Sequence, residues 1–136
     1  MNKSQTYLLS LTFLFLFGSF VYGAEPEVNR EYWDNGKLKK ETYYKNGKEE
    51  GVVTVWYKNG QKQTIGYYKQ GKLNGLLSSW YQNGKKMSET SYIDGKEAGF
   101  ATSWYISGKK RQDINYLDGQ LNGVQTWWYK SGKKEE

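Results

Sequence analysis

The sequence contains neither cysteine nor histidine, and it has one proline among its 136 residues. Without cysteine and histidine there is no Ser-His or Cys-His nucleophile pair, no imidazole base and no zinc site of the usual His/Cys type. Disulfide bonds cannot stabilise the fold. We therefore expect a protein that is not an enzyme and that uses no cofactor and no metal ion.

Long hydrophobic runs are confined to the start of the chain. Segment 8–17 is almost wholly apolar, and Lys3 gives the chain a positive start before it. Val21-Tyr22-Gly23 then offers small residues for cleavage. This combination is typical of a secretory signal peptide. A retained membrane anchor is the alternative, but the whole stretch 7–22 has 16 residues and a spanning helix needs about 20. No cysteine follows it, which excludes a lipid-anchored lipoprotein. We predict a signal peptide over 1–23 and a mature repeat domain over 24–136, exported to the periplasm, the cell surface or the extracellular medium.

Regularly spaced glycine is what the chain has in abundance. Thirteen of its 16 glycines fall into three sets whose members lie 24 residues apart, which indicates a tandem array. A unit of this length is too short to bury a core of its own, so neighbouring copies must cover one another and function should belong to a repeated surface. The turn set is Gly36, Gly60, Gly84, Gly108 and Gly132; the second set is Gly47, Gly71, Gly95 and Gly119; the third set is Gly51, Gly75, Gly99 and Gly123.

Each copy has the pattern of a β-hairpin. Runs such as 52–55 and 100–103 precede an Asn-Gly or Ser-Gly pair, for example Asn35-Gly36. Asn-Gly between extended runs favours a type I′ turn, because both residues accept a positive φ. A second connection, such as 94–99, carries two glycines and returns the chain to the next copy. The pattern predicts an all-β protein, an antiparallel meander of about nine strands that forms an elongated single sheet or a shallow solenoid.

Aromatic residues recur with the same period. Alternation along a strand places Val52 and Trp56 on one face and Tyr57 on the other. The first copy has the order reversed, as Tyr32-Trp33. We expect a structural aromatic ladder made of Trp56, Trp80, Trp104 and Trp128 together with Tyr44, Tyr68, Tyr92 and Tyr116.

The tryptophan row has two interpretations. Exposed indole rings on a rigid sheet could stack on sugar rings, whereas in a thin sheet the same rings supply packing area. We favour packing, and we expect the tyrosines that follow the tryptophans, on the opposite face, to be the better contact surface. These tyrosines are Tyr57, Tyr81, Tyr105 and Tyr129.

Lysine is concentrated at the turns, and the chain has a formal net charge of +6. A row of lysines can simply keep strands soluble, or it can meet lipid headgroups, envelope phosphates or an acidic protein. We do not expect nucleic acid as a ligand of an exported chain. Lysine directly follows the turn glycine at positions 37, 85, 109 and 133, and the candidate contact surface adds Lys62, Lys86, Lys110 and Lys134.

Carboxylates are the remaining candidates for catalysis or calcium binding. Asp94 and Asp118 each precede a glycine at the same place in the repeat, where aspartate suits a turn without any chemistry. A calcium site needs several oxygen ligands in one loop, and these loops offer one acid among lysines. We expect neither function.

The unit Trp-Tyr-x-Asn-Gly-Lys-Lys, followed by Tyr-x-Asp-Gly-Lys-x-x-Gly, resembles the bacterial variant of the MORN repeat over residues 28–136. The resemblance implies an exported repeat protein, and some members of that family are described as antitoxins of toxin-antitoxin systems. The eukaryotic form carries a histidine before its closing glycines, and this chain has none. Lipid or kinase associations of that form therefore transfer poorly.

These features predict a non-catalytic exported protein that mediates protein–protein interaction, as a scaffold or as an antitoxin or immunity-type partner. The alternative is a module that binds an envelope glycan, a polyanion or a phospholipid headgroup. Antitoxin action in the cytoplasm would conflict with the signal peptide. The sequence does not identify the partner protein, and it leaves end-to-end self-association of the array open.

Overall fold

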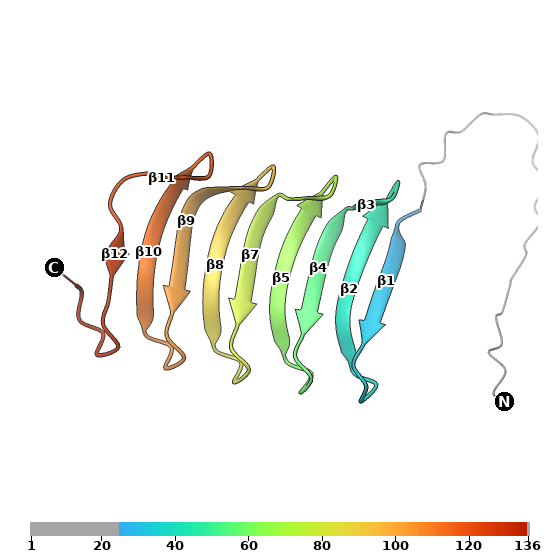
Figure 1. The fold of residues 1–136 in the computed structure, drawn as a ribbon, viewed down its shortest axis with the longest axis horizontal. Coiled ribbons are helices and arrows are strands. Elements are labelled where there is room, and N and C mark those ends of the chain that lie inside the picture. The colour runs from blue at the N-terminus through green and yellow to red at the C-terminus, as the bar shows by residue number, and fades with distance from the viewer. Residues whose placement is uncertain (1–24, 136) are drawn as a thin grey trace, which may run out of the picture.

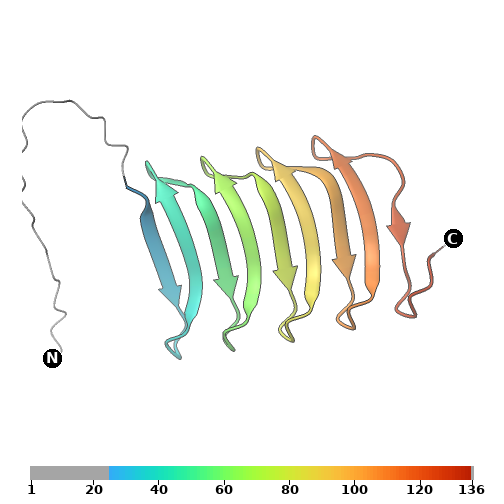
Figure 2. The same ribbon diagram turned by 180° about the vertical axis from the view of Figure 1, so that it is seen from behind.

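The computed structural model describes residues 25–135, which form one antiparallel β-sheet of twelve strands and no helix. Figure 1 and Figure 2 show this sheet from its two sides as a single open layer, and no other element of the described chain covers either face. The strands are β1 (Glu27–Tyr32), β2 (Leu38–Lys45), β3 (Lys48–Glu49), β4 (Gly51–Trp56), β5 (Lys62–Lys69), β6 (Lys72–Leu73), β7 (Gly75–Trp80), β8 (Lys86–Ile93), β9 (Lys96–Trp104), β10 (Lys110–Leu117), β11 (Gln120–Leu121) and β12 (Thr126–Trp127).

The sheet follows the order of the chain. Its main path is β1-β2-β4-β5-β7-β8-β9-β10-β11, and β12 pairs with β10. Five strands (β1, β4, β7, β9 and β12) enter the turns that hold the turn glycines, and four (β2, β5, β8 and β10) leave them. The predicted all-β meander of about nine strands is therefore confirmed. The predicted signal peptide, 1–23, lies outside the described residues.

The second connection adds the short strands β3, β6 and β11, which lie at the upper edge in Figure 1, opposite the turn glycines. We call the turns at this edge the upper turns, and those with the turn glycines the lower turns. The main path, these short pieces and β12 account for every strand in the described part of the chain.

The lower turns differ from the predicted type. The N–H of Gly36 donates to the carbonyl of Trp33 at 2.9 Å, and the N–H of Trp33 donates to the carbonyl of Lys37 at 2.8 Å. This pattern is a three-residue loop, a type I turn followed by one residue with positive φ. That residue is the glycine, with φ of 78° at Gly36, while Asn35 accepts a hydrogen bond from the Lys37 N–H through Oδ1 at 3.1 Å. The type I′ prediction for Asn-Gly is wrong, because asparagine serves here through its side-chain acceptor.

Two consecutive residues with positive φ, as a type I′ turn requires, occur instead at the upper turns. In the first copy Asn46 and Gly47 have φ of 52° and 71°, and the pair Lys45↔Lys48 closes the two-residue loop. The other copies place a polar non-glycine residue at the first of these positions. These residues are Gln70, Asp94 and Asp118.

The sheet has almost no hydrophobic core. Among the described residues, Val53 is the only hydrophobic side chain that is close to fully buried, with 7% exposed. The other buried side chains are small and polar, and they lie in mid-strand on both faces: Thr42, Thr54, Ser78 and Ser79. We call the face that carries Trp56, Trp80 and Trp104 the Trp face, and the face that carries Tyr44, Tyr68, Tyr92 and Tyr116 the Tyr face.

Gly66 shows how neighbouring copies adjust their volumes. It is buried in the middle of β5, and a Cβ at this position would lie 3.0 Å from both Leu73 Cδ2 and Leu77 Cδ1. One copy further on, the positions of Gly66 and Leu77 are held by Thr90 and Ala101, which pair across β8 and β9. Glycine beside leucine in one copy thus takes the place of threonine beside alanine in the next.

The substitution Gly66→Thr should lower the free energy of unfolding by about 1–3 kcal/mol, because the added atoms overpack the site against Leu77. The double variant G66T/L77A recreates the pair found one copy on and should recover part of that loss. Urea unfolding of the three proteins measures both effects. If L77A gives no recovery, the two positions do not share one packing volume.

Candidate binding surface

Hydrogen bonds from each copy to the next organise the lower edge of the sheet. The hydroxyl of Tyr57 donates to the backbone carbonyl of Trp80 at 2.7 Å. The same bond joins Tyr81 to Trp104 at 2.7 Å and Tyr105 to Trp128 at 2.8 Å. Three of the four tyrosines of the predicted contact surface are thus half-buried and use their hydroxyls inside the sheet, whereas Tyr129 is 55% exposed.

The reversed aromatic order of the first copy fits the same arrangement. Trp33 occupies the position that tyrosine has in the other copies, and its indole Nε1–H donates to the carbonyl of Trp56 at 3.1 Å. Tyr32, at the tryptophan position, is 58% exposed. An indole N–H can replace a phenol hydroxyl here because the carbonyl needs only a donor.

The lysines that directly follow the turn glycines also bind the next copy. The ammonium of Lys37 donates to the carbonyl of Asn59 at 2.9 Å, and the side-chain amide of Asn35 donates to the carbonyl of Lys58 at 3.0 Å. Each lower turn therefore satisfies the exposed carbonyls of its neighbour. The same lysine bond recurs from Lys85 to Ser107 at 2.8 Å and from Lys109 to Ser131 at 2.6 Å.

The four lysines of the predicted contact surface are not equivalent. Lys86 forms an ion pair with Glu89, and Lys110 forms one with Asp113 at 2.7 Å. The remaining two, at positions 62 and 134, are exposed. The carboxylates come from the middle of β8 and β10 on the Trp face, where each also accepts a hydrogen bond from a hydroxyl of the paired strand.

The tryptophan row is half-buried along the Trp face. Lysine ammoniums cover part of it, since Lys86 Nζ lies 5.6 Å from the ring centre of Trp80 and Lys110 Nζ lies 5.1 Å from that of Trp128. Such cation–π contacts are worth about 0.5–1 kcal/mol at exposed sites. The lysines therefore hold the indole rings against the sheet.

The tyrosines of the Tyr face lie beside one another along the array. Burial raises the pKa of Tyr92, and the nearby charge of Glu97 raises it further, with smaller contributions from Tyr116 and Tyr68. Burial likewise raises the pKa of Tyr68, with a further contribution from Glu49. These phenols are therefore partly withdrawn from water.

A third row, which the sequence analysis did not single out, is exposed along the array: four of its five members lie in strands on the Trp face, and Val124 lies between β11 and β12. It has one apolar residue from each copy, at positions 24 residues apart: Val28, Val52, Leu76, Phe100 and Val124, with exposed fractions of 40%, 44%, 49%, 74% and 85%. We call these five residues the apolar row. The signal was present in the sequence, because an apolar residue directly follows every glycine of the third set.

Cross-strand pairing places the apolar row at right angles to the strands. Val28 pairs with Tyr43, Val52 with Tyr67, Leu76 with Ser91 and Phe100 with Asn115. Residues that pair across antiparallel strands share a face. The row therefore alternates an apolar side chain with a side chain that can donate a hydrogen bond.

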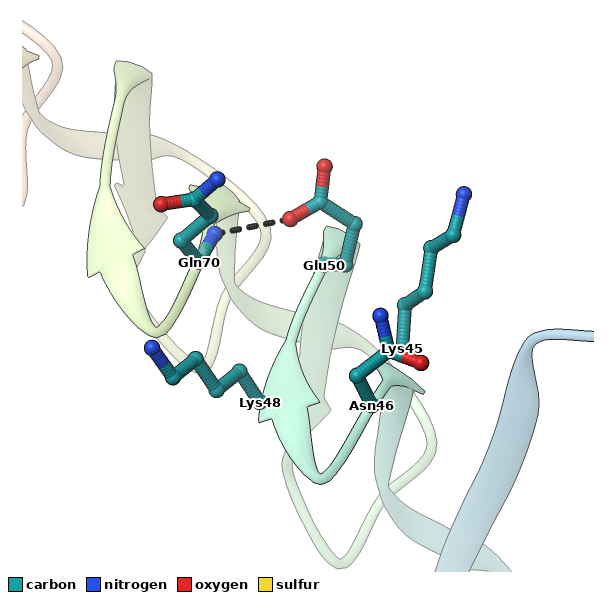
Figure 3. A pocket seen from close by; sticks show the side chains of 5 residues that line it. All are labelled: Lys45, Asn46, Lys48, Glu50 and Gln70. Carbon is teal, nitrogen blue, oxygen red and sulfur yellow. Dashed lines mark hydrogen bonds between the residues drawn. The ribbon is translucent and has the colours of Figure 1, made fainter. Parts of the chain in front are cut away.

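The upper turns enclose a shallow hollow between the first two copies (Figure 3), with a volume of about 330 Å³. Its lining is polar, and the one carboxylate in it, Glu50, accepts a hydrogen bond from the N–H of Gln70 at 2.7 Å. The other lining residues are Lys45, Asn46 and Lys48. The hollow is a gap between successive turns, and its acid is already used to join them.

Metal ligands do not gather anywhere in residues 25–135, where no three acidic side chains lie close enough to hold an ion. The described part of the chain also has no helix long and apolar enough to cross a membrane.

Replacing Tyr81 by phenylalanine should lower the free energy of unfolding by about 0.5–1.5 kcal/mol, because the Trp104 carbonyl loses its donor. The matched control is Tyr129→Phe at the equivalent position of the last copy, where the side chain is exposed and the change should stay within about 0.5 kcal/mol. Urea unfolding compares the two variants. Equal losses would contradict a role for the hydroxyl in joining copies.

Comparison with protein families identifies the repeat. A family model described as MORN repeat variant matches residues 28–46, 49–70, 73–94 and 121–136, more than half of the chain. No curated protein matches the sequence. The copy between the last two matches has Ser107 in place of the turn asparagine, yet it forms the hairpin of β9 and β10 and makes the same bond through Tyr105. From its matched repeats the chain belongs to the MORN repeat variant family.

Proposed function

We propose that this chain is an exported binding protein that presents its Trp face to a partner protein, as a scaffold or as an antitoxin or immunity-type partner. MORN repeats are generally non-enzymatic modules that bind proteins or membranes. The observation that carries the proposal is the apolar row, one exposed apolar side chain from every copy, four of them on one face of the sheet. Rows of this kind on a soluble protein usually mark an interaction surface.

The surroundings of the row favour a protein as the partner. Exposed apolar and aromatic residues form the energetic centre of many protein interfaces, and charged residues are depleted there. On the Trp face, Glu41, Glu89 and Asp113 each form an ion pair with a basic side chain of the same sheet. Arg30 lowers the pKa of the Glu41 carboxyl through a hydrogen bond. This paired charge can border an apolar contact without leaving an ion unpaired.

The alternative partner, an envelope glycan or polyanion, has less support. Of the lysines expected to attract phosphates, those at 37, 85 and 109 donate to backbone carbonyls of the next copy, and those at 86 and 110 pair with carboxylates. A polyanion would have to compete with these bonds. Stacking of sugars on the indole rings of Trp80 and Trp128 would have to displace the lysines that lie over them.

Export and the antitoxin role rest on the sequence. The apolar segment near the start has the length and flanks of a signal peptide. The hypothesis of an antitoxin role comes from the resemblance to bacterial MORN variants. Both fit together if the partner acts outside the cytoplasm.

The test is capture of partners from envelope and culture fractions with the tagged chain at low and high salt. The variant L76S/F100S removes the centre of the apolar row, and Ile106→Ser, which changes an equally exposed residue at a lower turn, is the control. We expect the wild type and I106S to retain one protein in stoichiometric amount at both salt concentrations, and L76S/F100S to lose it. Recovery of wall polymer or lipid alone, released by salt, would contradict the proposal, as would a partner that L76S/F100S still binds.

A further inference from the structure

The spacing of the apolar row restricts the shape of what can lie along it. The first four members, Val28, Val52, Leu76 and Phe100, belong to strands β1, β4, β7 and β9, each of which is two strands from the next. Neighbouring strands lie about 4.8 Å apart, so consecutive apolar side chains recur about every 9.6 Å along the array. A ligand that contacts every copy must repeat at this distance.

Peptide conformations differ in how well they meet this requirement. A polyproline II helix has three residues per turn and rises 3.1 Å per residue, so one of its faces repeats about every 9.3 Å. An α-helix presents the same face after seven residues, about 10.5 Å. A β-strand turns successive side chains to opposite sides. The residue three positions further on, about 10 Å away, therefore points away from the sheet. Over the three intervals between the four members in strands, the polyproline II helix falls out of step by about 0.9 Å, and the α-helix by about 2.7 Å.

The side chains between the apolar ones suit the same conformation. A polyproline II segment has no internal hydrogen bonds, so its carbonyls remain free to accept. The row places a donor group between apolar neighbours, in the order Val52-Tyr67-Leu76-Ser91-Phe100-Asn115. In the described chain, the side chains of Tyr67, Ser91 and Asn115 donate to no other residue, whereas Tyr43 donates to Glu41. Apolar surfaces with aromatic side chains are the known setting for recognition of such helices.

We propose that the apolar row binds an extended polyproline II segment of the partner protein, which places one apolar residue in three against the sheet and offers its carbonyls to Tyr67, Ser91 and Asn115. The inference rests on the proposed function, because it names the conformation of the partner at the same surface. Recognition is then additive along the array, with one triplet for each copy.

The test uses synthetic Pro-Pro-Leu repeats of two to five triplets, titrated into the full chain and followed by calorimetry. Affinity should rise by about fivefold with each added triplet, since each buries part of one leucine. Leu76→Ser should weaken the five-triplet peptide by about tenfold, and the control I106S should bind as the wild type does. Two further peptides of similar length carry leucine at every fourth position of a proline-rich chain and at every seventh position of a helical chain.

Binding that follows the triplet spacing and depends on Leu76 supports the inference. Equal binding of the four-residue spacing, or tighter binding of the helical peptide, would overturn it while leaving a protein-binding row in place. If no peptide binds, but partner capture still depends on L76S/F100S, the polyproline II inference fails and the proposed function stands. If neither peptide binding nor partner capture responds to these substitutions, both fail.

Discussion

The fold depends on hydrogen bonds that each copy makes to the next, about 24 residues along the chain. At the lower edge a tyrosine hydroxyl reaches the backbone carbonyl of the next tryptophan, as from Tyr57 to Trp80. At the upper edge the N–H of a glycine of the second set reaches back, as from Gly71 to the carbonyl of Glu49 at 2.8 Å. A single-layer sheet has no second layer to bury its side chains against. These bonds between copies, added to strand pairing and stacked side chains, take the place of a core.

This way of holding the sheet determines which surface remains for binding. The turn lysines, the turn asparagines and most of the paired tyrosines satisfy carbonyls of the neighbouring copy. The tryptophan rings are half-buried, and lysines lie over those of Trp80 and Trp128. The apolar row has no such internal partner among the described residues and is exposed along its length. A repeated structure thus leaves a repeated contact, and each added copy lengthens it.

The period of glycines and aromatic residues was enough to predict the sheet, its order and its strand number, because turns and alternation are local properties. The turn type was not accessible in the same way. Asn-Gly suits both a type I′ turn and the observed three-residue loop. The hydrogen bond that the Asn35 side chain accepts from the Lys37 N–H favours the observed loop. The role of Tyr57 depends on a backbone carbonyl 23 residues away, which no residue pattern marks. The apolar row could have been found from the sequence, because its positions recur with the same 24-residue period as the glycines.

Removal of one complete copy, residues 73–96, tests most directly whether the array is held by contacts between neighbours. This deletion joins Lys72 to Glu97, which occupy successive positions of the repeat, so every remaining copy keeps the same number of neighbouring copies as before. The account predicts a shorter sheet that still unfolds cooperatively in urea, with lower stability and an m value smaller by about one fifth. Complete loss of folding, or an unfolding free energy equal to that of the full array, would contradict it.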